Sequence, residues 1–388
     1  MTDVLVVGAG PVGLALGADL RARGVDVAIV ERRGETDAGT RAIGIHSPSL
    51  AHLELSGATD ALLARAVRIR RGEARADGRT LAAIRFDRLR ARHPYVAALP
   101  QSDTVEQLTH LAPAVERGVR VIAVREDGPG VRVQTTGLDG DRERRARIVV
   151  VASGWAGREL VYRPGAVRTR HYPDRYAMVD VIAPGDATAL VHLERGGVVE
   201  SFPLPDGRRR LVAWAGMEDV QDAAGFLRGA LADRVGLEVD TSAATTFRVR
   251  RAVAPALRRG RVIVVGDAAH EVSPIGGQGM NLGLLDALTL SPLLAEWVRG
   301  QEPSGLAAWE RGRVASARHA ARLAFLNTML GRGATPVAHA ARSQALRAVL
   351  RGPGGAAFTR AYAMDFDAAA RGGAARREVA RREVARGE

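Results

Sequence analysis

Two kinds of hydrophobic spacing alternate at the start of the chain. Residues 3–7 form a short apolar run typical of a buried strand, and residues 14–23 have the apolar spacing of a helix. Residues 25–30 form a second apolar run that ends in Glu31. This order predicts a strand–helix–strand unit, followed by a helical stretch over residues 48–67.

The middle of the chain alternates with a period of two. Short segments within residues 67–95 flank Asp77-Gly78, which predicts a hairpin. A helix is expected within residues 99–118, with an apolar face formed by Val105, Leu108, Leu111 and Val115. Seven more strands are then predicted, and the last four have hairpin-like spacing. Their ranges are 119–125, 131–136, 147–152, 175–183, 189–194, 198–204 and 209–214.

The last third changes to helical spacing. Residues 261–265 read as a buried strand that ends in Gly266-Asp267, and an apolar helix is expected over 280–298. From residue 283 the chain is predicted to be helical to its end, with breaks at 331–333 and 352–355.

Composition restricts the class of protein. A chain of 388 residues can carry two substantial domains, and 46% hydrophobic residues exclude wholesale disorder. No apolar run is long enough to span a membrane, and the first strand starts too early for a signal peptide, so we expect a cytoplasmic protein. The lack of cysteine excludes disulfides, a thiol nucleophile and a redox-active cysteine pair.

The formal charge of +13 comes from arginine, because the chain contains no lysine. Schiff-base chemistry is therefore excluded. The arginines are scattered, only 4% of residues are aromatic, and no nucleic-acid module is present. We attribute the arginine to GC-rich codon usage rather than to nucleic-acid binding. A basic rim that attracts an anionic substrate or NADPH stays open.

The first candidate site is a glycine-rich turn. The sequence Gly8-Ala9-Gly10-Pro11-Val12-Gly13 fits the G-x-G-x-x-G pattern between the first strand and the first helix. Such glycines let the backbone approach a pyrophosphate, which the helix N-terminus then holds. Glu31 lies where an acid would accept hydrogen bonds from the adenosine ribose, and Arg32 either approaches the adenosine or is a surface arginine. By itself the pattern fits NAD, NADP or FAD.

The second candidate site follows the strand at 261–265. A glycine-lined loop and a helix start there form a pocket rimmed by backbone N–H groups, and Asp267 could accept hydrogen bonds from ribityl hydroxyls. This stretch resembles the second flavin motif of the flavoprotein aromatic hydroxylases, the para-hydroxybenzoate hydroxylase family. The matching residues are Gly266, Asp267, Ala268, Ala269, His270, Pro274, Gly277, Gln278, Gly279 and Asn281. Together the two motifs predict FAD.

The resemblance implies an α/β fold in which a Rossmann-like FAD-binding domain is interleaved with a mostly antiparallel substrate domain. The FAD-binding domain would comprise residues 1–67, 96–165 and 250–298. The substrate domain would comprise residues 68–95 and 166–249, and C-terminal helices over 299–388 would cover the junction.

The resemblance also implies roles for single residues. Arg41 would lie beside the isoalloxazine, and Gln101 would contact the ribityl–phosphate region; Val124 is a further expected cofactor contact. Gly279, Met280 and Asn281, at a helix N-terminus, would stabilise the negative charge of reduced flavin. Arg41, Pro274 and Gly277 are the expected catalytic residues, because the loop over 274–277 would shape the space where a flavin C4a-hydroperoxide forms.

One segment departs from the family pattern. Where the family has an Asp-Gly motif that contacts flavin and NADPH, this chain has Ser153-Gly154, and the internal serine has become Gly157. Of that motif only Gly154 and Arg158 remain. We therefore expect slow reduction by NAD(P)H alone, or electrons from another source such as a reductase partner.

The expected function is an FAD-dependent monooxygenase that uses NAD(P)H and dioxygen to hydroxylate an aromatic or polyketide-like small molecule, free or bound to a carrier protein. Two alternatives stay open: a reductase similar to the geranylgeranyl reductases, and a flavin-binding partner protein without turnover.

The substrate would lie on the predicted antiparallel sheet. Alternation places one set of side chains on a single sheet face, where they line a pocket or form core. Arg210, His46 and His171 are further pocket candidates, whereas His270 is expected to be structural. The set of expected substrate contacts is Met178, Phe202, Leu204, Val212 and Trp214.

Overall fold

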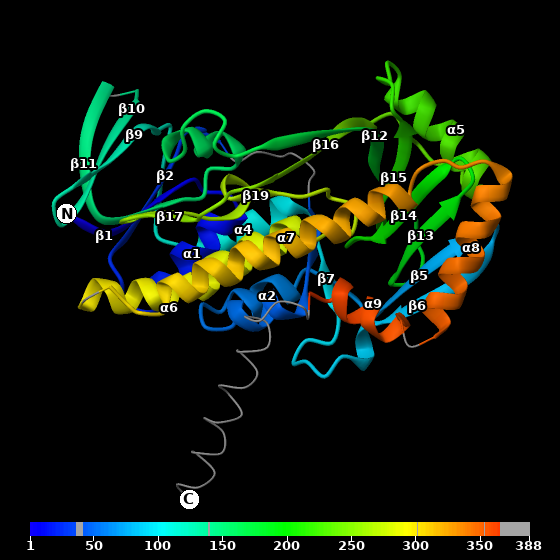
Figure 1. The fold of residues 1–388 in the computed structure, drawn as a ribbon, viewed down its shortest axis with the longest axis horizontal. Helices are drawn as coiled ribbons and strands as arrows, with labels where there is room; N and C mark the ends of the chain where they lie inside the picture. Colours follow the sequence, from blue (N-terminus) through cyan, green and yellow to red (C-terminus); the bar gives the residue numbers. More distant parts are fainter. Residues whose placement is uncertain (36–41, 139, 301, 353, 365–388) are drawn as a thin grey trace, which may run out of the picture.

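The computed structural model describes residues 1–35, 42–138, 140–300, 302–352 and 354–364. Two large sheets lie toward opposite ends of an elongated molecule, and long helices run between them (Figure 1). The chain begins in a central strand of the first sheet, at one end of the molecule, and returns to that sheet after building the second. The predicted α/β class with a mostly antiparallel second sheet is confirmed.

The first sheet is parallel at its centre. Strand β1 pairs in parallel with β2 and β11, β2 with β8, and β11 with β18. Helix α1 (Pro11–Ala22) connects β1 to β2, which confirms the predicted strand–helix–strand unit. Strands β9, β10 and β17 are antiparallel additions. The strands are β1 (Thr2–Val7), β2 (Val27–Glu31), β8 (Val115–Arg117), β9 (Arg120–Asp127), β10 (Gly130–Gly137), β11 (Gly140–Val151), β17 (Arg258–Arg259) and β18 (Val262–Val264).

The second sheet is antiparallel except where β13 pairs in parallel with β5. The predicted hairpin joins β5 to β6, with Asp77 and Gly78 at φ 49° and 70°, as a two-residue turn requires. The strands are β5 (Arg71–Ala76), β6 (Arg79–Arg85), β12 (Thr169–Ile182), β13 (Thr188–Glu194), β14 (Gly197–Pro203), β15 (Arg208–Gly216), β16 (Thr245–Val253) and β19 (His270–Glu271).

Several elements differ from the sequence prediction. Residues 48–67 are two short helices, α2 (Ser47–Leu53) and α3 (Ala58–Leu63), because Gly57 takes a left-handed conformation between them. Val115 does not continue helix α4 (Gln101–Leu111); it begins β8, since pairing with β2 outweighs helical spacing there. Helix α5 (Ala223–Val235) and strand β16 had not been predicted. Strand β16 also runs across the predicted domain boundary at residue 250, and the division into domains stays a prediction.

A small third sheet lies between the two large ones. It comprises β3 (Gly44–Ile45), β4 (Val67–Ile69) and β7 (Val96–Ala98), all antiparallel. Short 3-10 turns complete the connections; they are η1 (Phe86–Arg88), η2 (Trp155–Leu160) and η3 (Gly266–Ala268).

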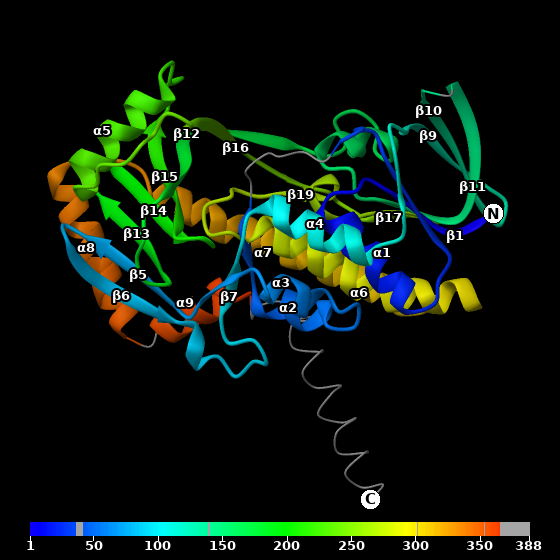
Figure 2. The same cartoon turned by 180° about the vertical axis from the view of Figure 1, so that it is seen from behind.

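Four helices end the described chain: α6 (Gly279–Arg299), α7 (Leu306–Leu330), α8 (Pro336–Arg351) and α9 (Gly354–Tyr362). The predicted breaks near 331–333 and 352–355 are present, but the interruption between α6 and α7 was missed. Helix α7 runs from the first sheet toward the second (Figure 2). Among the described residues, none of the helices is long and apolar enough to cross a membrane.

Candidate active site

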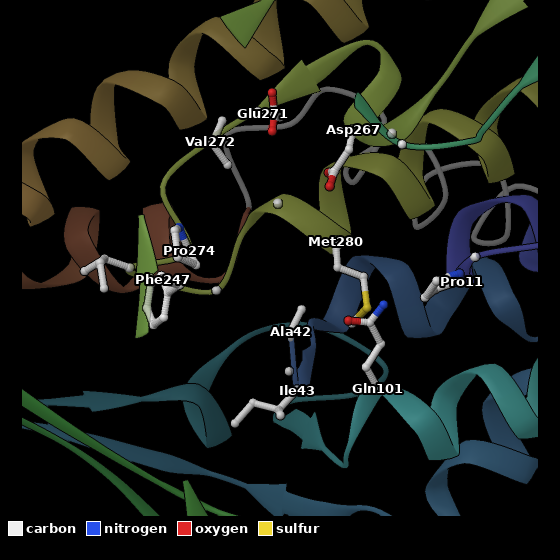
Figure 3. Close-up of a pocket in the computed structure, with 18 of the residues that line it drawn as sticks. Pro11, Ala42, Ile43, Gln101, Phe247, Asp267, Glu271, Val272, Pro274 and Met280 are labelled. Carbon is white, nitrogen blue, oxygen red and sulfur yellow. The ribbon is translucent and has the colours of Figure 1, made fainter. Parts of the chain in front are cut away.

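A cavity of about 1400 Å³ lies between the two large sheets. Pockets for small ligands commonly measure about 300–1,000 Å³, so this one has room for a large cofactor and a second ligand. Its wall combines the glycine-rich turn after β1, the loop before α6, one face of the second sheet and residues of α7, α8 and α9. Figure 3 shows Pro11, Asp267 and Met280 toward one side of this space and Phe247 and Pro274 toward the other.

The turn after β1 holds its backbone against β11. Gly8 has φ +109°, and a Cβ there would lie 2.7 Å from the Cα of Ser153 and 2.8 Å from the carbonyl oxygen of Ala152. A side chain at this position is therefore excluded. Helix α1 begins three residues later, so its N-terminal N–H groups point toward the cavity end lined by Gly8, Gly10, Pro11 and Val12. Gly13 lies behind that wall, closely packed against Gly8.

Glu31 makes hydrogen bonds within the protein, in addition to its predicted contact with the adenosine ribose. One carboxylate oxygen accepts a hydrogen bond from the Ala9 N–H at 2.9 Å, and the other accepts from the Arg33 N–H at 3.0 Å. The carboxylate therefore ties the glycine-rich turn to the end of β2. A carboxylate has about four acceptor positions, so Glu31 can still accept from a sugar hydroxyl. Arg32 and Gln101 also line the cavity, and Figure 3 shows the amide of Gln101 reaching toward Met280.

The second motif forms another part of the wall. Asp267, Pro274, Gly277, Gly279 and Met280 all line the cavity, where α6 begins. The N-terminus of this helix thus faces the same space as that of α1. Two helix N-termini and close-approaching backbone suit a diphosphate and an anionic ring, so the described residues fit FAD. Contacts of single residues with FAD stay predictions.

Asn281 links two segments of the protein, and its contact with the cofactor stays a prediction. It is buried, and its side-chain oxygen accepts from the His46 N–H at 2.8 Å. Its amide donates to the carbonyl oxygens of Gly44 at 2.8 Å and Gly277 at 3.2 Å. Asn281 thereby joins the start of α6 to β3, behind the cavity wall.

Arg41 lies outside the described residues. The chain that follows it does reach the cavity, because Ala42, Ile43 and Gly44 line the wall. Val124 is not among the described residues that line the cavity; it packs against the core of the first sheet.

A buried ionic cluster supports the second motif. The Asp286 carboxylate lies 2.6 Å from Nε2 of His270, accepts from Nε of Arg313 at 2.7 Å, and accepts from the Gly266 N–H at 3.1 Å. Burial opposes ionisation, but the neighbouring His270 and Arg313 outweigh it and lower the pKa of Asp286. His270 is thus structural, as expected. Asp286 and Arg313 were missed, although an aspartate within a leucine-rich helix was a detectable signal.

The altered Asp-Gly motif is closely packed. Ser153 and Gly154 line the cavity, yet the Ser153 hydroxyl oxygen is buried and has no hydrogen-bond partner among the described residues. A Cβ on Gly157 would lie 2.3 Å from that oxygen, so the two departures from the family pattern belong to one packed unit. Arg158, which the family pattern retains, makes contacts within the protein. It donates hydrogen bonds to the Glu271 carboxylate and to the Asp267 carbonyl oxygen, both at 2.8 Å.

The second sheet supplies the apolar part of the wall. Phe202 and Val212, which alternation predicted, line the cavity, and so does the further candidate Met178. Leu204 and Trp214 are not among the described lining residues. Leu204 is buried elsewhere, and Trp214 packs on Gly197 and Gly333 and donates its N–H to Asp174 at 2.9 Å. Alternation chose the face correctly but could not locate the edge of the cavity.

Titratable groups also face this space. His171 and Arg210 line the cavity as predicted, and so does His46, whose pKa burial lowers to about 4. His46 is therefore neutral at pH 7. Glu200, which sequence reasoning missed, lies on the same sheet face, and burial raises its pKa to about 8. Its neighbours in sequence gave no sign of this, because isolated glutamates in strands are usually exposed.

Comparison with known proteins agrees with the geometry. The family model described as "FAD binding domain" matches residues 1–200 and 208–324. The chain belongs to this family, and its cofactor is FAD.

Individual relatives have related activities. Rifampicin monooxygenase of Rhodococcus hoagii is 32% identical over 327 residues, which cover 79% of this chain and 66% of the relative. The 6-methylpretetramide 4-monooxygenase of Streptomyces rimosus is 34% identical, over 77% of this chain and 56% of the relative. The chain thus spans between about half and two thirds of the length of these curated relatives.

Solved structures share the fold. The p-nitrophenol 4-monooxygenase from Pseudomonas putida DLL-E4 superposes with a TM-score of 0.82 at 23% identity, covering 95% of this chain and 98% of that one. Aklavinone-11 hydroxylase, solved with FAD and aklavinone, has a TM-score of 0.72 at 24% identity, covering 86% and 69%. At this identity the likeness supports the fold.

Proposed function

We propose that this protein is an FAD-dependent monooxygenase that hydroxylates an aromatic or polyketide-like small molecule. One observation carries the proposal: the flavin-binding loops and the apolar face of the second sheet line one continuous cavity. A flavin bound at the first end would have its substrate space directly beside it. The names of the relatives favour this activity over a reductase or a flavin-binding protein without turnover.

The chemistry divides between cofactor and protein. Reduced FAD supplies oxygen activation and the transfer of one oxygen atom. The N-termini of α1 and α6 would hold the diphosphate and the negatively charged ring edge, because their N–H groups face the cavity. Pro274 and Gly277 shape the space above α6, and Phe202, Val212 and Met178 exclude water on the substrate side.

The chain departs from the family pattern at the Asp-Gly motif, which in the family contacts flavin and NADPH, so the identity of the electron donor is in question. A carboxylate at position 153 would add charge, whereas the Ser153 hydroxyl is buried against Gly157. We therefore propose that NAD(P)H reduces the bound flavin slowly, or that a reductase partner supplies electrons. A carrier-protein partner and a cytoplasmic location also stay predictions from the sequence.

The test begins with anaerobic mixing of the FAD-loaded protein with NADPH and then NADH, following flavin absorbance at about 450 nm. Slow bleaching supports the proposal on the donor, and bleaching at rates of about 10 s⁻¹ or more contradicts it. Dioxygen labelled with the heavy isotope is then admitted with an aromatic substrate panel. A product that contains one labelled oxygen atom supports a monooxygenase, whereas flavin reoxidation without oxygen incorporation across the panel contradicts that function.

A further inference from the structure

A single row of side chains crosses the second sheet and faces the cavity. The register aligns Ala74 with Val191, Val191 with Glu200, Glu200 with Val212, and Val212 with Met178. All five residues line the cavity. Four of them are apolar, and the carboxyl group of Glu200 stands at the centre of the row. A ligand that covers the centre of this row would contact that group.

Glu200 is a buried acid that nothing within the described protein satisfies. The residue is only 4% exposed and lines the cavity, and its carboxyl makes no hydrogen bond or ion pair with any described residue. Buried carboxyl groups in proteins are otherwise paired, since an unpaired one is costly. Burial raises the pKa of Glu200 to about 8, so near pH 7 it is an uncharged acid that can both donate and accept.

The charged and titratable side chains near Glu200 do not supply the missing partner for its carboxyl group. Arg210, in the adjacent row, donates two hydrogen bonds to Asp180 at 2.7 and 2.8 Å. Tyr176 of β12 and Tyr362, at the end of α9, are near enough for Glu200 to act on them: burial, together with the charge of Glu200, raises the pKa of both tyrosines. Both phenols therefore stay neutral near pH 7.

We propose that Glu200 is a specificity-determining residue of the substrate end: its carboxyl hydrogen-bonds a hydroxyl or carbonyl group on an uncharged aromatic ligand, and its ionised form disfavours anionic ligands. The apolar row holds the ring system, and the single acid sets its orientation. A ligand without a polar group would leave the buried acid unpaired, and an anionic ligand would meet a like charge once Glu200 ionises. This inference deepens the proposed function, on which its reference to a substrate rests.

The test measures binding without turnover. FAD-loaded, oxidised protein is titrated with 2-naphthol, 2-methylnaphthalene and 2-naphthoate, following the change in flavin absorbance. These probes share one ring system and differ in a hydroxyl, a methyl and a carboxylate group. The variants are Glu200→Leu and Glu200→Gln. The matched control is Glu194→Gln, which alters a buried acid on the neighbouring strand β13 outside the cavity wall.

We expect the wild-type protein to prefer 2-naphthol over 2-methylnaphthalene by about tenfold, the ratio that one hydrogen bond between neutral groups supplies. Glu200→Leu should abolish this preference, and Glu200→Gln should keep part of it. Binding of 2-naphthoate to the wild type should weaken as pH rises toward 8.5, since Glu200 then ionises. Neither Glu200 variant should show that weakening, and the Glu194→Gln control should behave as wild type.

An unchanged preference in Glu200→Leu, with FAD content and melting temperature retained, would overturn the inference. So would equal loss in the Glu194→Gln control, or failure of all three probes to bind the wild type. These readouts need neither an electron donor nor oxygen. Absence of hydroxylated product therefore counts only against the proposed function, and an unchanged probe preference counts only against the role of Glu200.

Discussion

At the scale of single residues, the pKa values of two buried acids are shifted in opposite directions: that of Asp286 is lowered and that of Glu200 is raised. Asp286 is surrounded by His270, Arg313 and the Gly266 N–H, which favour its charged form. Glu200 is surrounded mainly by apolar side chains of the cavity wall, which favour its neutral form. The residue type is similar and the burial comparable, so the difference comes from the neighbours. Asp286 is thereby part of the framework, and Glu200 is left for a ligand.

The raised pKa of Glu200 predicts a pH-dependent cost in stability. Below the ordinary pKa of 4.5 the acid is protonated in both folded and unfolded chains. Between 4.5 and about 8 only the folded chain retains the proton, so the folded state loses stability as pH rises. Glu200→Gln removes this loss. Relative to wild type it should gain about 4 kcal/mol between pH 4.5 and 8.

Urea unfolding at several pH values measures this gain. Glu296→Gln, an exposed change on α6, serves as the control and should give no such trend. A stability difference for Glu200→Gln that stays constant with pH would contradict the expected titration.

Arg313 carries a second prediction at this scale. Arg313→Leu would remove the arginine partner of the fully buried Asp286 carboxylate and leave His270 and the Gly266 N–H beside it. Removing one member of a buried ion pair commonly costs about 3–5 kcal/mol, and we expect a loss in that range. Denaturant unfolding of the FAD-loaded protein measures it, with the exposed Arg311→Leu on the same helix as control. Equal effects of the two changes would show that the ion pair contributes little.

At the scale of elements, the crossing of α1 and α6 brings the two flavin motifs together. Gly283 of α6 faces Val12 of α1 and Gly266, so the absence of a side chain allows the close approach. A Cβ on Gly283 would lie 2.6 Å from Val12 Cγ2 and 2.9 Å from Gly266 Cα. The second contact is with backbone, which cannot move aside without displacing the loop.

Gly283→Ala should therefore destabilise the protein by about 1–3 kcal/mol, as overpacking does, and weaken FAD binding. The matched change Gly312→Ala lies in α7 at a position with no atom within 4 Å of the added Cβ. It should be neutral or stabilise by up to about 1 kcal/mol, because alanine favours helix. Thermal unfolding and FAD titration of both variants measure these changes in stability and FAD affinity. Equal changes in the two variants would argue against a tight crossing of α1 and α6.

At the scale of the whole molecule, the cavity is formed by segments from most of the chain. Its wall includes residues from β1, the third sheet, the second sheet and the C-terminal helices. A ligand that fills this space must therefore contact both sheets at once. Binding of FAD to the folded state alone stabilises that state by mass action.

Removal of FAD should lower the melting temperature of the entire protein. At a free FAD concentration of 100 times the dissociation constant, the expected stabilisation is about 2.7 kcal/mol. Differential scanning calorimetry over a range of FAD concentrations measures this. Lumiflavin, which lacks the diphosphate that the helix N-termini would hold, is the control. A melting temperature independent of FAD would contradict the predicted site.

Much of the fold could be predicted because it depends on local patterns. Alternation located most strands of the second sheet, although it missed β16, and the turn at Asp77-Gly78 located its hairpin. Prediction failed where contacts between distant segments determine the secondary structure. Val115 lies in β8 because that strand pairs with β2, although the spacing of apolar residues there is helical.

By itself, the sequence determined the order of most elements and the two glycine-rich motifs, since helical and strand periods and left-handed backbone are properties of neighbouring residues. Only the tertiary structure decided which side chains face the cavity. It separated Phe202 and Val212 from Leu204 and Trp214, paired Asp286 with Arg313, and left Glu200 buried without a described partner. Burial and pairing depend on segments that meet only in the folded protein, so a pattern along the chain cannot contain them.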